Sequence, residues 1–294
     1  MIPPARHTQS TQLRWRPAAA ATLALTTLVG LAAFLWPFVA TPEFATGRGQ
    51  DAPWLFAALL GLLSAVLLGE ITARGLDAKT IAVLGVLAAA GGALRVLSAG
   101  TAGLEPMFVV LVLGGRVLGR SMGFLLGALA LLTGAFLTAG IGPWLPFQML
   151  GAGWVAFGAA CLPRAAGRIE LALLAGYGLL AGLGYGMLLN LWFWPFLSPA
   201  TAPTGAGFVP GAAVGENLRH YATFYLATSL GWDLPRAVLT AVLVRVAGPT
   251  VLRALRRAVR RAAFAAPATF DTTADPVRAA DVSPREPAPG RTAA

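Results

Sequence analysis

The sequence predicts an all-α integral membrane protein that crosses the bilayer about eight times. Hydrophobic residues make up 57% of the 294-residue chain and charged residues only 12%, whereas a soluble domain carries roughly 25% charge. The apolar residues form runs of helical span length, and the arginines lie at the ends of these runs. The net charge of +10 is therefore not the basic face of a nucleic-acid-binding protein.

Eight apolar segments are candidate spans, because a helix needs about 20 apolar residues to cross the hydrocarbon core. The first seven cover about residues 17–40, 53–73, 80–98, 106–118, 122–139, 146–162 and 169–193. The eighth begins near residue 235 and continues past residue 246. The fourth is short for a span. The basic segment 1–16 precedes an apolar run that is too long for a cleaved signal peptide, so we expect a retained first span.

The basic residues predict the orientation of these spans. They occur in every second connection. Arg6, Arg14 and Arg16 precede the first span, and Arg74 and Lys79 lie between the second and third. Arg116 and Arg120 separate the fourth and fifth spans, Arg164 and Arg168 the sixth and seventh, and Arg253, Arg256, Arg257, Arg260 and Arg261 follow the eighth. By the positive-inside rule, both termini are cytoplasmic, and an even number of spans agrees with that.

The segment 140–149, GIGPWLPFQM, interrupts the apolar sequence between the fifth and sixth spans. Its prolines and glycines cannot continue a helix through hydrocarbon, and irregular backbone near a bilayer needs protein or water to satisfy its amides. The charge pattern predicts that the segment lies on the outer side of the membrane. It is either a plain turn or the lip of a lined cavity.

Polar and aromatic residues gather at the span ends on this outer side. Besides the segment 140–149, they include Arg95, Glu105, Asn190, Trp192, Trp194, Tyr221, Tyr225, Trp232, Asp233 and Arg236. An ionisable group at membrane depth costs roughly 3 kcal/mol or more unless it is paired or hydrated, so such groups mark functional sites. The sequence predicts that substrate binds to Trp144, Gln148, Arg95, Asn190, Trp192, Asp233 and Arg236.

Each of these residues also has a structural interpretation. Tryptophans at helix ends form an interfacial belt, which fits Trp192 and Trp194. Asp233, followed by Leu-Pro-Arg, is typical of a helix N-cap. Arg95 and Glu105 have the alternative of pairing with each other at the surface.

Small residues recur at every fourth position in several spans. Such stripes let helix backbones approach closely, either within the bundle or against another membrane protein. They are Gly85, Ala89 and Ala93; Gly119, Gly123 and Gly127; and Gly178, Gly182 and Gly186. The first stripe is the best candidate for a docking face.

Four sequence pieces, in this order, resemble the substrate-binding (S) component of energy-coupling factor (ECF) transporters, the vitamin-uptake systems of prokaryotes. They are LAAAGGALRVLS (87–98), EPMFVVLVLGGRVLGRSMGFLLGALALL (105–132), GIGPWLPFQMLGAGWVAFGA (140–159) and SLGWDLPRA (229–237). The resemblance implies a six-helix binding core at about residues 79–262. Residues 1–78 then form a cytoplasmic tail and two additional spans, and residues 263–294 form a disordered cytoplasmic tail.

The resemblance also implies partners and a location. S components bind a vitamin at the outer face of the prokaryotic cell membrane and associate with a transmembrane coupling (T) protein and two cytoplasmic ATPases. The family docks through an Ala-x-x-x-Ala pattern, which Ala89 and Ala93 match here, with Gly85 one turn earlier. The sequence has no GxxxxGK[ST] loop of its own, so the energy would come from partners or from a gradient.

The motifs are most similar to the cobalamin branch of the family, so we expect cobalamin as the vitamin. With one cysteine, Cys161, and two histidines, His7 and His220, the sequence predicts no metal site and no resident cofactor. Two other classes of function remain open. An intramembrane protease or lipid-modifying enzyme would have His220 as its only histidine beyond the N-terminal tail, and a structural membrane subunit would leave the polar rim unexplained.

Overall fold

A computed structural model of the chain describes residues 17–39, 57, 58, 60–65, 69, 78–98, 101–197 and 202–263. Most of the second predicted span, about residues 53–73, lies outside the described residues. So do the basic segment 1–16 and the predicted disordered tail from residue 264 onward.

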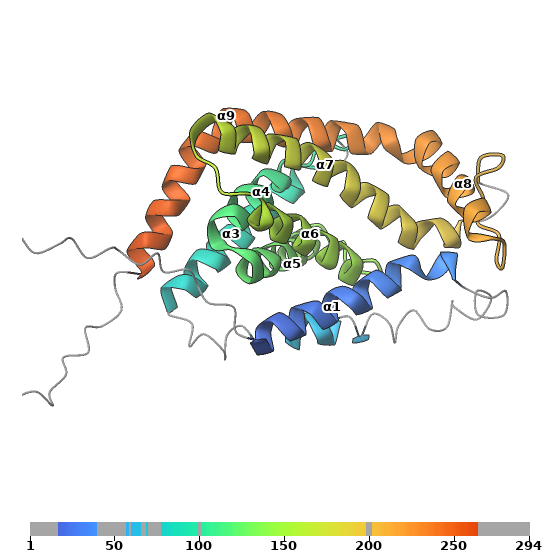
Figure 1. Ribbon diagram of the computed structural model, residues 1–294, viewed down its shortest axis with the longest axis horizontal. Helices are drawn as coiled ribbons and strands as arrows, with labels where there is room; N and C mark the ends of the chain where they lie inside the picture. Colours follow the sequence, from blue (N-terminus) through green and yellow to red (C-terminus); the bar gives the residue numbers. More distant parts are fainter. Residues whose placement is uncertain are drawn as a thin grey trace, which may run out of the picture.

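All regular structure in these described ranges is helical (Figure 1). The elements are α1 (Pro17–Leu35) with the 3-10 turn η1 (Trp36–Phe38), α3 (Ala78–Val96), α4 (Met107–Leu118), α5 (Arg120–Leu137), α6 (Leu145–Cys161), α7 (Gly167–Phe193) with η2 (Trp194–Phe196), α8 (Val214–Phe224), the π-helical turn η3 (Tyr225–Ser229) and α9 (Leu230–Ala263).

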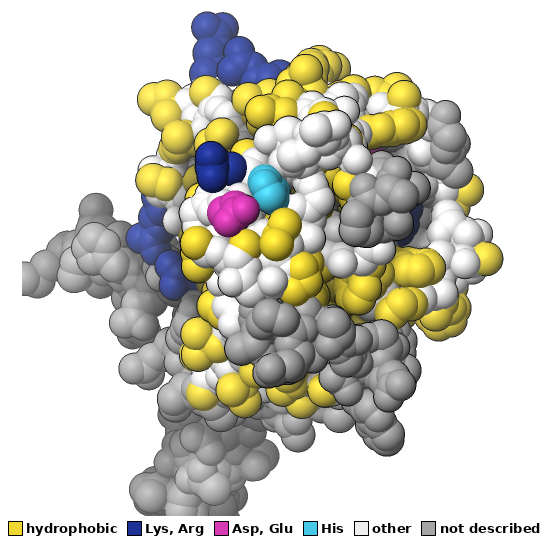
Figure 2. All heavy atoms as spheres, turned by 90° about the vertical axis from the view of Figure 1, so that its right-hand side faces the viewer, with side chains coloured by type: hydrophobic (Ala, Val, Ile, Leu, Met, Phe, Trp, Pro, Cys, Tyr) yellow, Lys and Arg dark blue, Asp and Glu magenta, His cyan; other side chains and the backbone are white. Residues whose placement is uncertain are grey.

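Five described segments are long and apolar enough to cross a membrane, which makes the architecture compatible with a helical membrane protein. They are Ala20–Phe38, Lys79–Val96, Arg120–Leu137, Gly167–Phe196 and Val214–Arg261. Helices α4 and α6 are shorter apolar helices. In an end-on view from the side of α8, hydrophobic side chains are spread over the visible surface among few charged ones (Figure 2).

Glycines let three pairs of helices pack closely, two of them through Gly127 and Gly182 of the small-residue stripes and one through Gly92, which is in no stripe. A Cβ atom at Gly127 would overlap the backbone of Ala152 in α6, and one at Gly182 would lie 2.7 Å from the Cα of Ala237 in α9. Gly92 abuts Thr133 in α5 in the same way. Helices α7 and α9 consequently run side by side along the upper edge of the molecule (Figure 1).

The turn between α4 and α5 depends on one glycine conformation. Gly119 has a φ of +86° and donates its N–H to the carbonyl of Gly115, which closes α4. This left-handed region costs other residues steric strain. The Gly-Arg pair at 119–120 therefore reverses the chain within one residue.

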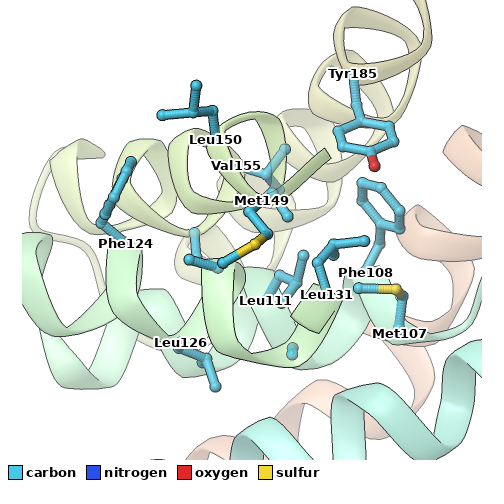
Figure 3. Packing of buried hydrophobic residues seen from close by; sticks show 14 of the residues in the cluster. Met107, Phe108, Leu111, Phe124, Leu126, Leu131, Met149, Leu150, Val155 and Tyr185 are labelled. Atoms are coloured by element: carbon cyan, nitrogen blue, oxygen red, sulfur yellow. The ribbon is translucent and has the colours of Figure 1, made fainter. Parts of the chain in front are cut away.

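The core lies between α4, α5, α6 and α7. Leu111, Phe124 and Leu126 are completely buried, and the Phe108 ring meets the edge of the Tyr185 ring at a centroid distance of 4.9 Å (Figure 3). Aromatic pairs of this edge-to-face type contribute about 0.5–1.5 kcal/mol beyond their burial. Tyr185 thus anchors α7 to α4 next to the polar residues described below.

Helix α1 shares this core. Phe34 packs edge-on against Phe147 of α6 at 5.0 Å, and the Trp154 indole N–H donates to the Thr27 hydroxyl at 3.2 Å. The described part of the N-terminal segment 1–78 is therefore attached to the predicted binding core by aromatic packing and a hydrogen bond.

A buried ion-pair cluster ties the helix ends that the sequence predicts to be cytoplasmic. Glu170, which is 3% exposed, accepts hydrogen bonds from Arg116 at 2.9 Å and Arg256 at 2.6 Å. Arg116 also donates to the carbonyls of Leu162 and Pro163, both at 2.9 Å. The cluster joins α4, the α6–α7 connection, α7 and α9 at one end of the bundle.

The start of the last helix differs from the sequence prediction. Helix α9 begins at Leu230 rather than near Pro235, because the π turn η3 continues the helix from α8 without a break. Asp233 is therefore inside α9 and is not its N-cap. The N-cap prediction was wrong, since the preceding residues satisfy the helical N–H groups that an N-cap would bind.

Candidate functional site

A polar cavity of about 490 Å³ opens at the end of the bundle opposite the Glu170 cluster. Because successive helices are antiparallel, the ends of α3, α5 and α7 meet the beginnings of α4, α6 and α9 there. The lining residues are Arg95, Ser98, Glu105, Thr138, Gln148, Tyr185, Gly186, Leu189, Asn190, Ser229, Trp232, Asp233 and Arg236.

Arg236 is the centre of the cavity's charge network. Its Nε and Nη2 atoms donate to the two carboxylate oxygens of Glu105 at 3.0 and 3.1 Å, and its Nη1 donates to Asp233 Oδ1 at 2.5 Å. The Arg236 residue is only 7% exposed. Bidentate pairs of this kind are among the strongest hydrogen bonds in proteins, and they compensate the cost of burying the charge.

Two aromatic rings hold the Arg236 guanidinium in place. Its central carbon lies 5.5 Å from the centroid of Phe108 and 5.4 Å from that of Tyr185. The Nη1 atom also approaches the Gly182 carbonyl at 3.4 Å. Cation–π contacts gain strength when water is excluded, so this guanidinium has a single defined orientation.

Asp233 has a second carboxylate oxygen that takes no part in its bond to Arg236. Its residue is 3% exposed, and its Oδ2 atom is buried with no hydrogen-bond partner in the described part of the protein. The hydroxyl of Tyr225 is also buried outside normal hydrogen-bond geometry, and it is the side-chain donor that faces the Asp233 carboxylate. The carboxylate lies against Gly186, where any Cβ atom would overlap it. A buried unsatisfied oxygen is costly and calls for an explanation.

Arg95 and Gln148 form the opposite wall. Arg95 Nη2 donates to Gln148 Oε1 at 2.9 Å, and the arginine stem crosses Gly134, where a Cβ atom would lie 2.5 Å from Cδ. The alternative that Arg95 pairs with Glu105 was wrong. Both oxygens of Glu105 are taken by Arg236, so Arg95 turns instead to the first turn of α6.

The structure separates the two predicted tryptophans from the cavity lining. Trp144 donates its indole N–H to the Gly140 carbonyl at 3.1 Å and meets Trp192 edge-on at 6.3 Å. Trp192 packs further against Phe147 and Phe196 at 5.7 and 5.6 Å. These four aromatic residues form a cluster beside the cavity, and neither tryptophan is among its lining residues.

The other five predicted residues all line the cavity. They are Arg95, Gln148, Asn190, Asp233 and Arg236. Asn190 donates a side-chain amide N–H to the Gly186 carbonyl at 2.8 Å, so its amide oxygen remains available to accept a hydrogen bond. The segment 140–149 therefore contributes through Gln148, while its turn supports the neighbouring aromatic cluster.

The site prediction did not include Tyr185, Ser98, Thr138 and Ser229, and Glu105 and Trp232 appeared only as general rim residues. Helical spacing carries a signal for one of them. Ser98 follows the predicted Arg95 by three residues, and Tyr185 precedes Gly186 of the predicted glycine stripe by one and the predicted Asn190 by five, so only Ser98 shares a helix face with a predicted site residue. Thr138 and Ser229 have no comparable signal, because ordinary span ends carry such residues.

The two cations and two carboxylates of the cavity balance each other. Arg95 and Arg236 face Glu105 and Asp233, so the cavity walls carry separated charges of both signs with no net charge. No group of three or more His, Cys, Asp and Glu side chains that could hold a metal ion occurs among the residues that the structure describes. The arrangement suits the binding of a polar organic molecule with both donors and acceptors.

The predicted docking residues lie together on the surface of α3. Gly85, Ala89 and Ala93 are all exposed, and a Cβ atom at Gly85 would meet open space. The opposite side of the helix is packed through Ala88 and Gly92. The stripe is therefore a smooth exposed face of the described bundle.

Comparison with known proteins finds no family model that matches the chain, and no curated protein or solved structure matches it either.

Proposed function

We propose that the protein is the substrate-binding membrane subunit of an importer of the energy-coupling factor type, and that it binds its substrate in the polar cavity. The observation that carries this proposal is the cluster of Arg236, Glu105 and Asp233. It places three ionisable groups at the wall of an open cavity, with Arg236 and Asp233 buried and Glu105 partly exposed. Buried charges at membrane depth are retained where they serve a substrate or ion.

The cavity's size supports a small-molecule substrate. Its volume of about 490 Å³ falls within the range of roughly 300–1,000 Å³ that is typical of small-molecule sites. Cobalamin is the first ligand to test, because the sequence motifs are most similar to that branch. Only one part of so large a molecule would enter the cavity. The half-exposed Trp144 and the adjoining Trp192 offer a flat surface for the rest.

In this proposal, helix α3 connects the substrate cavity to the surface on which the coupling protein docks. Arg95 lies at its cavity end, and Ala93 and Ala89 continue down its exposed face. A transmembrane coupling protein would pack on this stripe, because small side chains permit close helix contact. Two cytoplasmic ATPases bound to that partner would supply the energy. The long apolar helices support a location in a lipid bilayer, and we propose that this bilayer is the cell membrane.

The experiment is identification of the bound molecule. The protein is extracted in mild detergent, small molecules that co-purify are identified by mass spectrometry, and cobalamin binding is measured by calorimetry. We expect a stoichiometric ligand that is lost in Arg95→Gln and retained in Arg260→Gln, which removes an exposed arginine far from the cavity. Absence of any ligand, together with no cobalamin binding, would contradict the proposal.

The enzyme hypothesis has less support. His220, the histidine that this hypothesis requires, donates its Nδ1–H to the backbone carbonyl of Gly207 at 2.9 Å. It is on α8 and does not line the cavity. A His220→Ala variant that keeps full biological activity would count against a histidine mechanism.

A further inference from the structure

A second hollow, of about 700 Å³, is lined mainly by α7, with Arg245 of α9 and Leu162 at the end of α6, near the cytoplasmic end that the arginines predict. Its wall is formed by Ile169, Leu173, Gly176 and Leu180, with Arg168 and Arg245 as its charged residues. Ile169 and Leu180 are each 68% exposed. We refer to this hollow, defined by these six residues, as the α7–α9 groove.

Arg245 is the unusual member of the groove. It lies well inside the long helix α9, between Thr240, which packs on Gly178, and Gly248, which packs on Leu171. Its side chain is exposed, and no ion pair in the described part of the chain includes it or Arg168. An unpaired arginine inside a membrane span is costly, and an anionic group or the polar interface within reach of its side chain lowers that cost.

The carboxylate nearest in sequence is not available as that anionic group. Glu170 is buried and already receives hydrogen bonds from Arg116 and Arg256. The two guanidinium groups of the groove are therefore free to act together. Arg245 is level with about residue 173 of α7, which places it about 8 Å along the helix axis from Arg168. A long arginine side chain can cover most of such a distance toward the polar interface.

The groove's length matches one leaflet of a bilayer. Twelve residues separate Arg168 from Leu180, which corresponds to about 18 Å of helix, and half of the hydrocarbon core is about 15 Å. Arg168 lies at one end of the groove and Arg245 nearly halfway along it, and Gly176 and Leu180 continue beyond both arginines toward the bilayer centre. Gly176 has open space where a Cβ atom would be, so the wall is recessed at its middle.

We propose that the α7–α9 groove binds an anionic phospholipid of the inner leaflet. Its phosphate is held between Arg168 and Arg245, and an acyl chain lies along Ile169, Leu173 and Leu180 in the recess above Gly176. This inference depends on the membrane embedding of the helices and on the predicted orientation, and it is independent of the transport proposal.

The experiment measures lipid retention by native mass spectrometry. The full-length protein in mild detergent is incubated with phosphatidylglycerol or, separately, with phosphatidylcholine of the same acyl chains. We expect selective retention of phosphatidylglycerol, and a selectivity that falls about fivefold for each arginine removed in Arg168→Gln and Arg245→Gln. Arg260→Gln, outside the groove, is expected to keep it.

A second pair of variants tests whether the recess at Gly176 holds the acyl chain. Gly176→Leu fills the groove without changing its charge, and Gly184→Leu adds the same side chain at another open position on α7. We expect loss of the retained lipid in the first and none in the second. Equal retention of the two lipids by the unmodified protein, or selectivity that survives loss of both arginines, would overturn the proposal. So would a stoichiometric second polypeptide that is displaced by Gly176→Leu in place of lipid.

Discussion

Arg236 and Glu105 face each other through two parallel hydrogen bonds, of 3.0 and 3.1 Å, although 131 residues separate them in the sequence. The pair joins the beginning of α4 to the beginning of α9 at the wall of the polar cavity. Asp233 adds a third charge from the same helix as Arg236. The cavity wall therefore depends on one guanidinium that pairs with two carboxylates.

Removing that guanidinium should destabilise the fold. In Arg236→Gln, the carboxylates of Glu105 and Asp233 lose their only cation, and breaking a buried pair costs about 3–5 kcal/mol. We expect a clear fall in the midpoint of thermal unfolding in detergent. Arg260→Gln serves as the control, because that arginine is exposed near the end of α9. Equal stability of the two variants would show that the network is not structural.

The contact between Gly186 and Asp233 yields a sharper test of the cavity's geometry. In Gly186→Ala, the new methyl group overlaps the Asp233 carboxylate, so the carboxylate or α9 must move. Gly184→Ala adds the same methyl group on the same helix where there is open space. We expect Gly186→Ala to lower both stability and ligand binding, and Gly184→Ala to leave both unchanged. Binding is measured by calorimetry with the identified ligand.

Gln148 and Trp144 should differ in their contributions to binding. Gln148→Ala removes a cavity-lining amide and the partner of Arg95, and one lost hydrogen bond to a charged group corresponds to about 1.5–3 kcal/mol. Trp144 lies outside the lining, so Trp144→Ala should weaken binding less. Calorimetric affinities decide the order, and a larger loss in Trp144→Ala would place the ligand on the aromatic cluster.

The exposed stripe on α3 should affect transport without affecting binding. Ala89→Leu and Ala93→Leu add bulk where a partner helix would pack, so we expect substrate uptake and co-purification of a coupling protein to fall. Ligand binding by the purified protein should remain unchanged. Ala90→Leu, on the neighbouring exposed side of the same helix, is the control. Normal co-purification in the Ala93→Leu variant would exclude docking through this stripe.

In the Glu170 cluster, removal of the more buried arginine should destabilise the protein more than removal of the more exposed one. The Arg116 side chain is 10% exposed and the Arg256 side chain 42%. Solvent screens the exposed partner more strongly, and Arg116 also loses two backbone carbonyl partners. We expect Arg116→Gln to lower the unfolding temperature more than Arg256→Gln. The reverse order would mean that the clamp to α9 dominates this end of the bundle.

Much of the fold could be predicted from the sequence because membrane helices are defined by local properties. Apolar runs set the positions of α3 to α7 to within a few residues, and glycine spacing in α7 indicated close helix packing without indicating that α9 is the partner. The start of α9 was predicted five residues too late. The π turn that joins it to α8 has no proline or charge pattern that distinguishes it from a break.

The sequence by itself determined the helical class, the charge difference between the two ends of the bundle, and the end at which polar residues gather. The tertiary structure alone decided that Glu105 pairs with Arg236 rather than with Arg95, that Trp144 and Trp192 pack beside the cavity, and that Asp233 is buried next to Arg236 and Tyr225. Spacing along one helix sets which residues share a face. Partners on different helices depend on how closely the glycine-lined backbones approach, and that distance arises only when the whole bundle is packed.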